Sequence, residues 1–579
     1  MAYRAPVTDF QFILDHVVDF PTVAATEMFA DATPDTTQAI LTEAGRMCQE
    51  VLAPVQRQGD LTPARLENGV VRCSPGFAEA YGAIAEGGWV GISAPAEYGG
   101  MGLPQTITSA VNDMMSAACL SLQLNPLMSQ GQIEALEHHA SDAIKQIYLP
   151  RLISGEWSGT MNLTEPQAGS DVGALRSRAT DNGDGSYSVS GQKIFISWGD
   201  NDFTGNVCHL VLARLPDAPA GTRGISLFMV PKRIPDAQGE PGTANSLRVV
   251  SLEHKLGLHG SPTAVMEFDG ATGWMIGEAN KGMAAMFTMM NNARLGVGIQ
   301  GIGVAEGAYQ HALAHAMDRQ QGRTSDKGES GGAGPIAEHA DVRRMLMHMK
   351  AEVFAARSLA LGCAVATDMA RATDEADWTA RAAFLTPIVK AFGTDIGIEV
   401  AQMGIQVHGG MGFIEETGAA QYLRDVRVTA IYEGTNGIQA MDLVGRKLAD
   451  GGDAAGRIID EIESCAEGCR ETLPDMAESI WQAAEALREA CDWLVDHPDM
   501  DDRFAGASAF LRAFARVTGA CAHLRAAMAE HTETGAAGPR TALARFYIER
   551  LLPEHTGLCA HATRGAAGLY AISNEDLAR

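Results

Sequence analysis

Long apolar runs and paired cysteine motifs are both missing from this sequence. No stretch of about eighteen consecutive apolar residues occurs, which argues against a helix that spans a membrane. The ten cysteines lack the spacing of a zinc site or a disulfide framework, and only Cys465 and Cys469 lie one helical turn apart. We therefore expect reduced, mostly buried cysteines. Residues 1–20 are acidic, unlike a secretory or mitochondrial leader, so the cytoplasm is the expected location.

Positive charge is also scarce, and lysine is absent after Lys447. The formal net charge is −27, and a surface this acidic repels phosphate backbones, so we expect no nucleic-acid partner. Between residues 450 and 502 the acidic side chains are opposed by only three arginines. This change in composition predicts a domain boundary near residue 450.

The pattern of apolar residues changes along the chain in a way that indicates helices, then strands, then helices again. Its 579 residues are too many for one ordinary core. Apolar residues recur at helical spacing up to about residue 156, and short segments rich in Val, Ile and Phe follow with close turns between them. Such closely spaced strands leave no room for crossover helices, which favours an antiparallel β-barrel or sandwich. We predict an α+β multidomain fold, with an N-terminal helical domain (1–156), a β domain (157–280), a helical bundle domain (281–449) and an additional helical C-terminal domain (450–579).

Three short polar motifs in the first half of the chain are ambiguous when each is taken alone. The glycine-rich stretch from Gly88 to Gly102 fits simple turns between helices. The segment Leu163–Asp171 could donate hydrogen bonds to a polar ring or to phosphates, or could be a capped turn. In Ser190–Ser197, an aromatic ring and a hydroxyl two residues apart share one face of a strand. That arrangement suits stacking on a planar ligand, although a core phenylalanine fits equally well.

Three more motifs lie in the second half. Gly296–Gly301 matches G-x-G-x-x-G, but helical texture precedes it, so we interpret it as small residues at a close helix contact and infer no dinucleotide-binding fold. The next is the glycine-rich segment Gln406–Phe413. In the last, Ile431–Gln439, Glu433 follows apolar residues and precedes Gly-Thr. Partial burial would raise its pKa and make it a usable base, whereas an ordinary loop glutamate is the alternative.

In this order and at these separations, the motifs resemble the acyl-CoA dehydrogenase family from about Phe77 to Lys447. The resemblance implies FAD bound between the β domain and the helical bundle, an acyl-CoA substrate, and an electron-transfer flavoprotein as acceptor. It also implies that Glu433 is the catalytic base. A minority of members carry the base immediately before the residue matching Arg294, where this chain has Ala293.

The resemblance assigns further residues to the cofactor and the substrate. Phe195 and Ser197 stand where many members have Trp and Thr. Residues matching Arg319, Gly322 and the Gln406–Gly410 loop contact the FAD of a neighbouring subunit, which implies a homodimer. The residues expected to bind FAD are Met161, Leu163, Thr164, Gly169, Ser170, Phe195, Ser197, Arg319, Gly322, Gln406, Gly409, Gly410, Thr435 and Asn436. Those expected to bind substrate are Ser170, Arg294, Glu433 and Gly434, and no metal is expected.

Among longer members, the chain is most similar to a bacterial group that acts on 3-(methylthio)propanoyl-CoA. The supporting features are the start Met1–Val7, the insertion Gln320–Pro335, the segment His339–Met345 and the C-terminal extension. The similarity implies oxidation of a short acyl-CoA, 3-(methylthio)propanoyl-CoA, to 3-(methylthio)acryloyl-CoA. The alternatives are a general short- or medium-chain dehydrogenase, an acyl-CoA oxidase, and a non-enzymatic relative with a basic DNA-binding C-terminal region, which the acidic extension disfavours.

Overall fold

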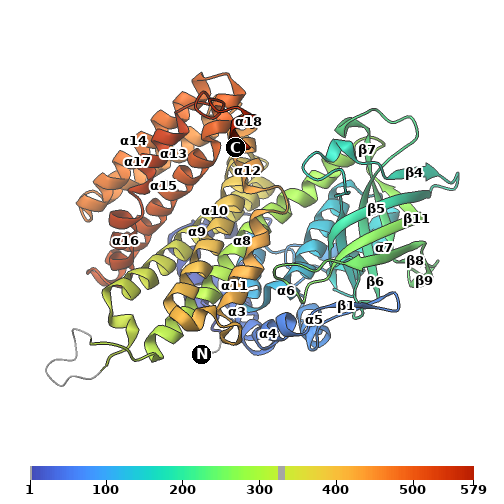
Figure 1. The fold of residues 1–579 in the computed structure, drawn as a ribbon, viewed down its shortest axis with the longest axis horizontal. Coiled ribbons are helices and arrows are strands. Elements are labelled where there is room, and N and C mark those ends of the chain that lie inside the picture. Colours follow the sequence, from blue (N-terminus) through green and yellow to red (C-terminus); the bar gives the residue numbers. More distant parts are fainter. Residues whose placement is uncertain (1–2, 324–332) are drawn as a thin grey trace. The chain divides into compact units, whose positions relative to one another are not determined.

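The computed structural model describes residues 3–323 and 333–579, so the segments Met1–Val7 and Gln320–Pro335 lie partly outside the described residues. The chain forms two compact units (Figure 1). Thr42–Ala293 make up the first, called the barrel unit, and Pro6–Leu41 with Arg294–Arg579 make up the second, called the helical unit. Helices α3 (Pro34–Met47) and α8 (Gly282–Asp318) cross the boundary between them. The predicted division after residues 156, 280 and 449 stays a prediction, because the compact units are larger than those domains.

The barrel unit begins with helices. They are α4 (Ala53–Leu61), α5 (Phe77–Glu86), α6 (Gln105–His139) and α7 (Asp142–Ile153). The preceding helix α3 passes through a π-helical turn, Cys48–Leu52, and continues as α4. Pro54 lies in the first turn of α4, where a missing N–H breaks no helical hydrogen bond.

A seven-stranded sheet forms the rest of this unit. The strand order is β10–β11–β5–β4–β6–β3, and β7 pairs with both β11 and β6, which closes a barrel. Its interior is filled by apolar side chains that include Val189, Phe228 and Met266. The strands are β3 (Trp157–Asn162), β4 (Arg178–Asp181), β5 (Tyr187–Ser197), β6 (Asn206–Arg214), β7 (Ile225–Pro231), β10 (Leu247–Leu252) and β11 (Thr263–Ile276), with separate hairpins β1 (Arg65–Glu67)–β2 (Val70–Arg72) and β8 (Arg233–Pro235)–β9 (Pro241–Ala244).

Most strand pairs in this sheet are antiparallel, as predicted, but β3 and β4 each run parallel to β6. Along the chain, β5 follows β4 and runs back in the opposite direction, and β6 then reverses direction again. Strands β4 and β6 therefore run in the same direction. The order of helices, barrel and helices confirms the α+β multidomain fold.

The core of the helical unit is a bundle of long helices. α8 packs closely on α10, because a Cβ at Gly298 or Gly301 would lie only 2.6 or 2.4 Å from the backbone oxygens of Val389 and Gly393. This confirms the small-residue contact predicted for the G-x-G-x-x-G match. The bundle comprises α1 (Val7–His16), α2 (Phe20–Ala24), α8, α9 (Ala340–Thr373), α10 (Ala376–His408), α11 (Ala419–Val426) and α12 (Asn436–Asp442).

The C-terminal extension of the helical unit packs on α9, α10 and α12, chiefly through α15. Its helices break near Pro498 and between Gly535 and Pro539. α9 is long and apolar enough to cross a membrane, yet 83% of its most apolar window is buried inside the protein, as in a core helix. The extension contains α13 (Asp453–Cys469), α14 (Pro474–Asp496), α15 (Met500–Thr534), α16 (Pro539–Arg550), α17 (Glu554–Ala562) and α18 (Asn574–Leu577).

Candidate active site

Glu433 lies in a tight loop between a short helical turn, Arg427–Ala430, and α12. Its backbone is left-handed, with φ of 56°, and Gly434 follows with φ of 85°. A positive φ is unfavourable for a residue with a side chain and persists only where its surroundings hold it. Thr435 caps α12, because its hydroxyl accepts a hydrogen bond from Ile438 N at 3.3 Å. The loop therefore presents Glu433 in a fixed, strained turn at the start of a helix.

A buried lysine on α10 holds the Glu433 loop in place through hydrogen bonds. Lys390 Nζ donates hydrogen bonds to the Gly434 carbonyl at 2.8 Å and to Asn436 Oδ1 at 3.0 Å. Asn436 in turn donates to Asp395 Oδ1 at 2.7 Å, and Gln439 Nε2 donates to the Glu433 carbonyl at 3.1 Å. Within the described ranges, no residue accepts a hydrogen bond from the Glu433 N–H. The backbone of the loop is thus fixed through its carbonyl groups while that amide stays open to a ligand.

The electrostatics of this loop favour a base that works near neutral pH. Burial raises the pKa of Glu433 to about 7, against the opposing charges of Arg294 and Lys390. Arg294 is buried and lies 4.0 Å from Asp442, so part of its charge is balanced there. A carboxylate with a pKa near the working pH is well placed to accept and release a proton.

In the barrel unit, the predicted cofactor loop Leu163–Asp171 is anchored by a buried ion pair. Lys193 Nζ donates to Glu165 Oε1 at 2.8 Å and to the Leu163 carbonyl at 3.0 Å. Glu165 also accepts hydrogen bonds from Ser177 N at 3.0 Å and from the Ser177 hydroxyl at 2.6 Å. Burial acts against the charged form, but Lys193 together with hydrogen bonds from Ser177 and Arg176 outweighs it and holds the pKa of Glu165 well below its usual range. Around this anchor, Thr164 is half-buried and Gly169 and Ser170 are exposed.

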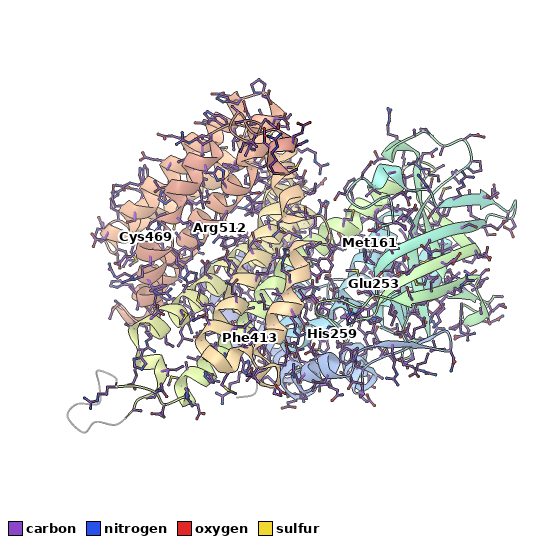
Figure 2. All side chains as sticks on the ribbon, viewed as in Figure 1. Met161, Glu253, His259, Phe413, Cys469 and Arg512 are labelled. Atoms are coloured by element: carbon purple, nitrogen blue, oxygen red, sulfur yellow. The ribbon has the colours of Figure 1, made fainter. Side chains whose placement is uncertain are left out.

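Phe195 and Ser197 lie beside that loop at the end of β5. The Ile194 N–H donates to the Thr164 carbonyl at 2.9 Å, which ties the two motifs together. Phe195 has φ of 60° at a bulge opposite β11, and 59% of the residue is exposed. Ile196 is buried and Ser197 half-buried, and the shared face of the aromatic ring and the hydroxyl stays a prediction, because the bulge at Phe195 interrupts the regular alternation of the strand. Met161, labelled in Figure 2, is the one half-buried residue of the otherwise buried strand β3.

The residues predicted to contact a second subunit's cofactor gather at the far end of the bundle. Arg319 directly follows α8, and Gln406 lies in the last turn of α10, where the rings of His315 and His408 stack at 4.3 Å. Gly409 and Gly410 follow in an exposed turn that ends at Phe413, which is 87% exposed (Figure 2). Gly322 has φ of 73°. Arg294 and Arg319 are about 25 residues apart, roughly 37 Å along a helix axis. This group therefore lies far from Glu433 of the same chain.

Sequence reasoning missed the residues that hold these segments in place. Lys390, Gln439, Glu165 and Lys193 were not among the candidates. Lys390 did carry a signal, because it is the lone charge in the apolar run Phe384–Phe392 of a helix. A lysine in such a run is buried only with partners, which indicates a structural or functional contact.

Family comparisons cover almost the whole chain. Residues 34–156 match the acyl-CoA dehydrogenase N-terminal domain, 160–271 the middle domain and 280–448 the C-terminal domain. Residues 458–573 match a domain described as acetyl-CoA dehydrogenase C-terminal like.

Comparisons with individual proteins agree with these family matches. The chain is 47% identical over 521 residues to a 3-methylmercaptopropionyl-CoA dehydrogenase of Ruegeria pomeroyi, covering 88% of each chain. It is 35% identical over 467 residues to a butyryl-CoA dehydrogenase of Syntrophomonas wolfei, covering 77% of this chain and 75% of that one. Its fold is similar to an acyl-CoA dehydrogenase of Bacillus anthracis solved with FAD, with a TM-score of 0.75, 19% identity, and coverage of 100% of this chain and 94% of that one.

Proposed function

The chain belongs to the acyl-CoA dehydrogenase family and uses FAD, and from this premise we propose that it oxidises 3-(methylthio)propanoyl-CoA to 3-(methylthio)acryloyl-CoA with Glu433 as base. The observation that carries the proposed chemistry is the carboxyl of Glu433, whose pKa burial raises to about 7 within a loop of strained, fixed backbone. The substrate is inferred from the similarity to the Ruegeria pomeroyi protein.

The base step follows from the local groups. The Glu433 carboxylate removes the α-proton of the thioester, and Arg294 and Lys390 favour the charged form of Glu433 before the transfer. The open Glu433 N–H donates a hydrogen bond to the thioester carbonyl, which stabilises the negative charge that develops on its oxygen. Lys390 keeps this N–H and carboxylate in place through the Gly434 carbonyl. When bound, FAD supplies the hydride acceptor for the β-hydrogen.

The barrel unit offers suitable groups for FAD. The exposed ring of Phe195 provides a stacking surface for a planar ring system, and the nearby hydroxyls of Thr164 and Ser197 provide hydrogen bonds. The anchored loop Leu163–Ser170 supports Met161, Gly169 and Ser170 as further contacts, with Ser170 also facing the substrate. In the helical unit, Thr435 and Asn436 lie beside Glu433 and are proposed as FAD contacts of that unit. The aromatic ring, the hydroxyls and the backbone amides of these residues fit a flavin cofactor.

The positions of the remaining cofactor residues support a homodimer. Arg319, Gly322, Gln406, Gly409 and Gly410 lie at the end of α8 and α10 remote from Arg294, so they serve the FAD of a second copy. We propose that the C-terminal extension covers surface that shorter members use to form tetramers, so that the assembly is a dimer. Light scattering should give a dimer, and a tetramer at working concentration would contradict this assembly. The electron acceptor is an electron-transfer flavoprotein.

A substrate panel tests the proposed activity. We would measure kcat/KM for 3-(methylthio)propanoyl-CoA and for butanoyl-, hexanoyl- and palmitoyl-CoA with an electron-transfer flavoprotein as acceptor. The methylthio substrate should be preferred, and butanoyl-CoA should also react, because a thioether approximates a methylene and one methylene contributes only about 1–3 kcal/mol of discrimination. A preference for palmitoyl-CoA above about a hundredfold would exclude the assignment. Fast hydrogen peroxide release without an added acceptor would point to an oxidase instead.

A further inference from the structure

A cavity of about 500 Å³ lies inside the helical unit, where the C-terminal extension meets the bundle. Helices α1, α2, α9 and α10 of the bundle contribute to its wall, together with α13 and α15 of the extension, which lie side by side (Figure 1). Its volume is in the range of about 300–1,000 Å³ that small-molecule sites occupy. The residues of the Glu433 loop do not line it, so the cavity is separate from the proposed dehydrogenation.

Much of the wall is apolar. Val365 and Met369 come from α9, Leu385 from α10, and Ile458 and Ile462 from α13. All five side chains are buried. An aliphatic chain that leaves water for such a wall gains roughly fourfold in affinity for each methylene buried. The wall therefore suits the hydrocarbon part of a ligand.

One hydroxyl on this wall lacks a partner. Ser358 on α9 is 3% exposed, and among the described residues its Oγ takes part in no hydrogen bond. The other two hydroxyls of the wall are satisfied, because Thr518 donates to the Phe514 carbonyl at 2.8 Å and Thr22 donates to Asp19 at 2.8 Å. Buried polar groups in folded proteins are nearly always hydrogen-bonded. Ser358 therefore indicates a ligand that carries a hydrogen-bonding group.

A guanidinium places positive charge on the same wall. Arg525 on α15 is half-buried and donates to the Val17 carbonyl at 3.0 Å, and in the described part of the chain no carboxylate lies within ion-pair distance of it. The other charged side chains of the wall have partners, which are Glu461 for Arg381, Glu533 for His16, Gln11 for Asp15 and Thr22 for Asp19. The three acids of the wall are also exposed to water. The charge that remains to be balanced is therefore positive.

We propose that this cavity binds a medium-chain aliphatic carboxylate. The carboxylate pairs with Arg525 and accepts a hydrogen bond from Ser358, and the chain lies against the apolar residues of α9, α10 and α13. A charge-assisted contact between a guanidinium and a carboxylate is among the stronger hydrogen bonds in proteins. The acyl group of an acyl-CoA is a thioester without a carboxylate, so the ligand is a free acid and differs from the proposed substrate. No bond is made or broken at this site.

The experiment titrates the FAD-loaded enzyme with octanoate, butanoate and octan-1-ol in a calorimeter. Octanoate should bind once per chain, butanoate at least about tenfold more weakly because fewer methylenes are buried, and octan-1-ol at least about tenfold more weakly because it has no charge for Arg525. Absence of octanoate binding up to about 1 mM, or equal affinity for the alcohol, would overturn the proposal.

A competition experiment separates this cavity from the acyl-CoA site. Glu433→Gln enzyme saturated with butanoyl-CoA should bind octanoate with unchanged affinity, because the two ligands occupy different places. Displacement of octanoate by butanoyl-CoA would assign the acid to the acyl-CoA site and overturn the proposal, while leaving the proposed dehydrogenation intact.

Two variants test the polar contacts. Arg525→Met should weaken octanoate binding at least about tenfold and Ser358→Ala at least about threefold, since each removes a hydrogen bond to a charged group. Thr518→Val is the matched control, because it removes a hydroxyl of the same wall that is already bonded to the Phe514 carbonyl. It should bind octanoate as the wild type does. Equal losses in Thr518→Val and Ser358→Ala would contradict the role of Ser358.

Gly362 on α9 allows the cavity to be filled without a change to its polar groups. Beyond its own helix, a Cβ at Gly362 would meet only Val18 Cγ1 within 4 Å, at 3.8 Å, so a larger side chain has room to extend from this wall. Replacement of a glycine inside a helix also favours the helical conformation. Gly362→Leu should therefore fold, keep the wild-type rate of flavin bleaching with acyl-CoA, and lose octanoate binding. Wild-type affinity for octanoate in this variant would show that the acid binds elsewhere.

Discussion

Two glutamates of the helical unit, the half-buried Glu433 and the buried Glu352, both lose hydration on folding and yet differ in protonation. Burial acts to raise both pKa values. At Glu352 on α9, Arg516 and His348 outweigh burial and hold the pKa at about 2, whereas at Glu433 burial prevails and the pKa is about 7. Arg516 Nη1 lies 2.6 and 2.7 Å from the two Glu352 oxygens. Near Glu433, Lys390 donates hydrogen bonds to Gly434 and Asn436 instead of to the carboxylate. Arg294 forms an ion pair with Asp442.

The difference teaches that a nearby cation lowers the pKa of a buried carboxyl group, and so keeps it charged, only when it binds that carboxylate directly. A cation that donates to neighbouring groups leaves the carboxylate desolvated and basic, which is what proton abstraction needs. The same point explains the triad His348, Glu352 and Glu399, whose ligand atoms lie within 4.8 Å of one another. Arg516 binds Glu352, and Arg512, labelled in Figure 2, lies 2.6 Å from Glu399, so both carboxylates already have cationic partners. This cluster is therefore interpreted as structural.

The largest expected effect comes from Glu433→Gln, which keeps the size and hydrogen bonding of the side chain but cannot take the proton. The rate of anaerobic flavin bleaching on mixing with substrate should fall about 10²–10⁴-fold. FAD content and acyl-CoA binding should persist, because neither depends on the carboxylate charge alone. Bleaching at the wild-type rate would show that another group is the base.

The same substitution at Glu352 should lower stability and leave the rate of flavin bleaching unchanged. Glu352→Gln removes one of the two carboxylates that bind the buried Arg516, which keeps Glu554, so the free energy of unfolding should fall by about 1.5–3 kcal/mol, as when a hydrogen bond to a charged group is lost. Flavin bleaching per folded enzyme should be unchanged, because Glu352 lies outside the Glu433 loop. Denaturant titration with stopped-flow kinetics measures both quantities, and a slower bleaching rate at unchanged stability would reverse the comparison.

The pH dependence of stability should also have opposite signs at the two sites. Because folding raises the pKa of Glu433 from 4.5 to about 7, its contribution is full below pH 4.5 and is lost as the pH rises toward 7. Because folding lowers the pKa of Glu352 from 4.5 to about 2, its contribution is present above pH 4.5 and is lost as the pH falls. Glu433→Gln should therefore gain about 1–3 kcal/mol relative to wild type between pH 5 and pH 8. A constant difference in unfolding free energy across that range would contradict the raised pKa.

Local sequence patterns predicted much of this arrangement, but they did not predict the charged partners that give Glu433 and Glu352 different pKa values. Helical spacing and closely spaced strands indicated the helix–barrel–helix order, and the Ile431–Gln439 motif indicated Glu433. The partners of the base could not be read locally, because Lys390 contacts Gly434 and Asn436 across separations of 44 and 46 residues. Closure of the barrel through β7 likewise depends on pairing between distant strands. Patterns within one element set its type, whereas charge balance depends on which elements meet.

The smallest effect tests whether Lys390 acts through Glu433. Lys390→Met keeps much of the side-chain length but removes the hydrogen bonds to Gly434 and Asn436 and a charge that lowers the pKa of Glu433. The pKa of the base should rise, so the acidic limb of the kcat/KM profile should move to higher pH, because only the deprotonated carboxylate accepts the proton. Activity near pH 7 should fall about fivefold and recover in part at higher pH, as expected for a shift of about one pKa unit upward from about 7. Lys193→Met provides the matched control, since it removes a buried lysine bound to Glu165 in the barrel unit and should change flavin content without moving that limb. An acidic limb that stays in place in Lys390→Met would show that Lys390 only supports the fold and does not tune the base.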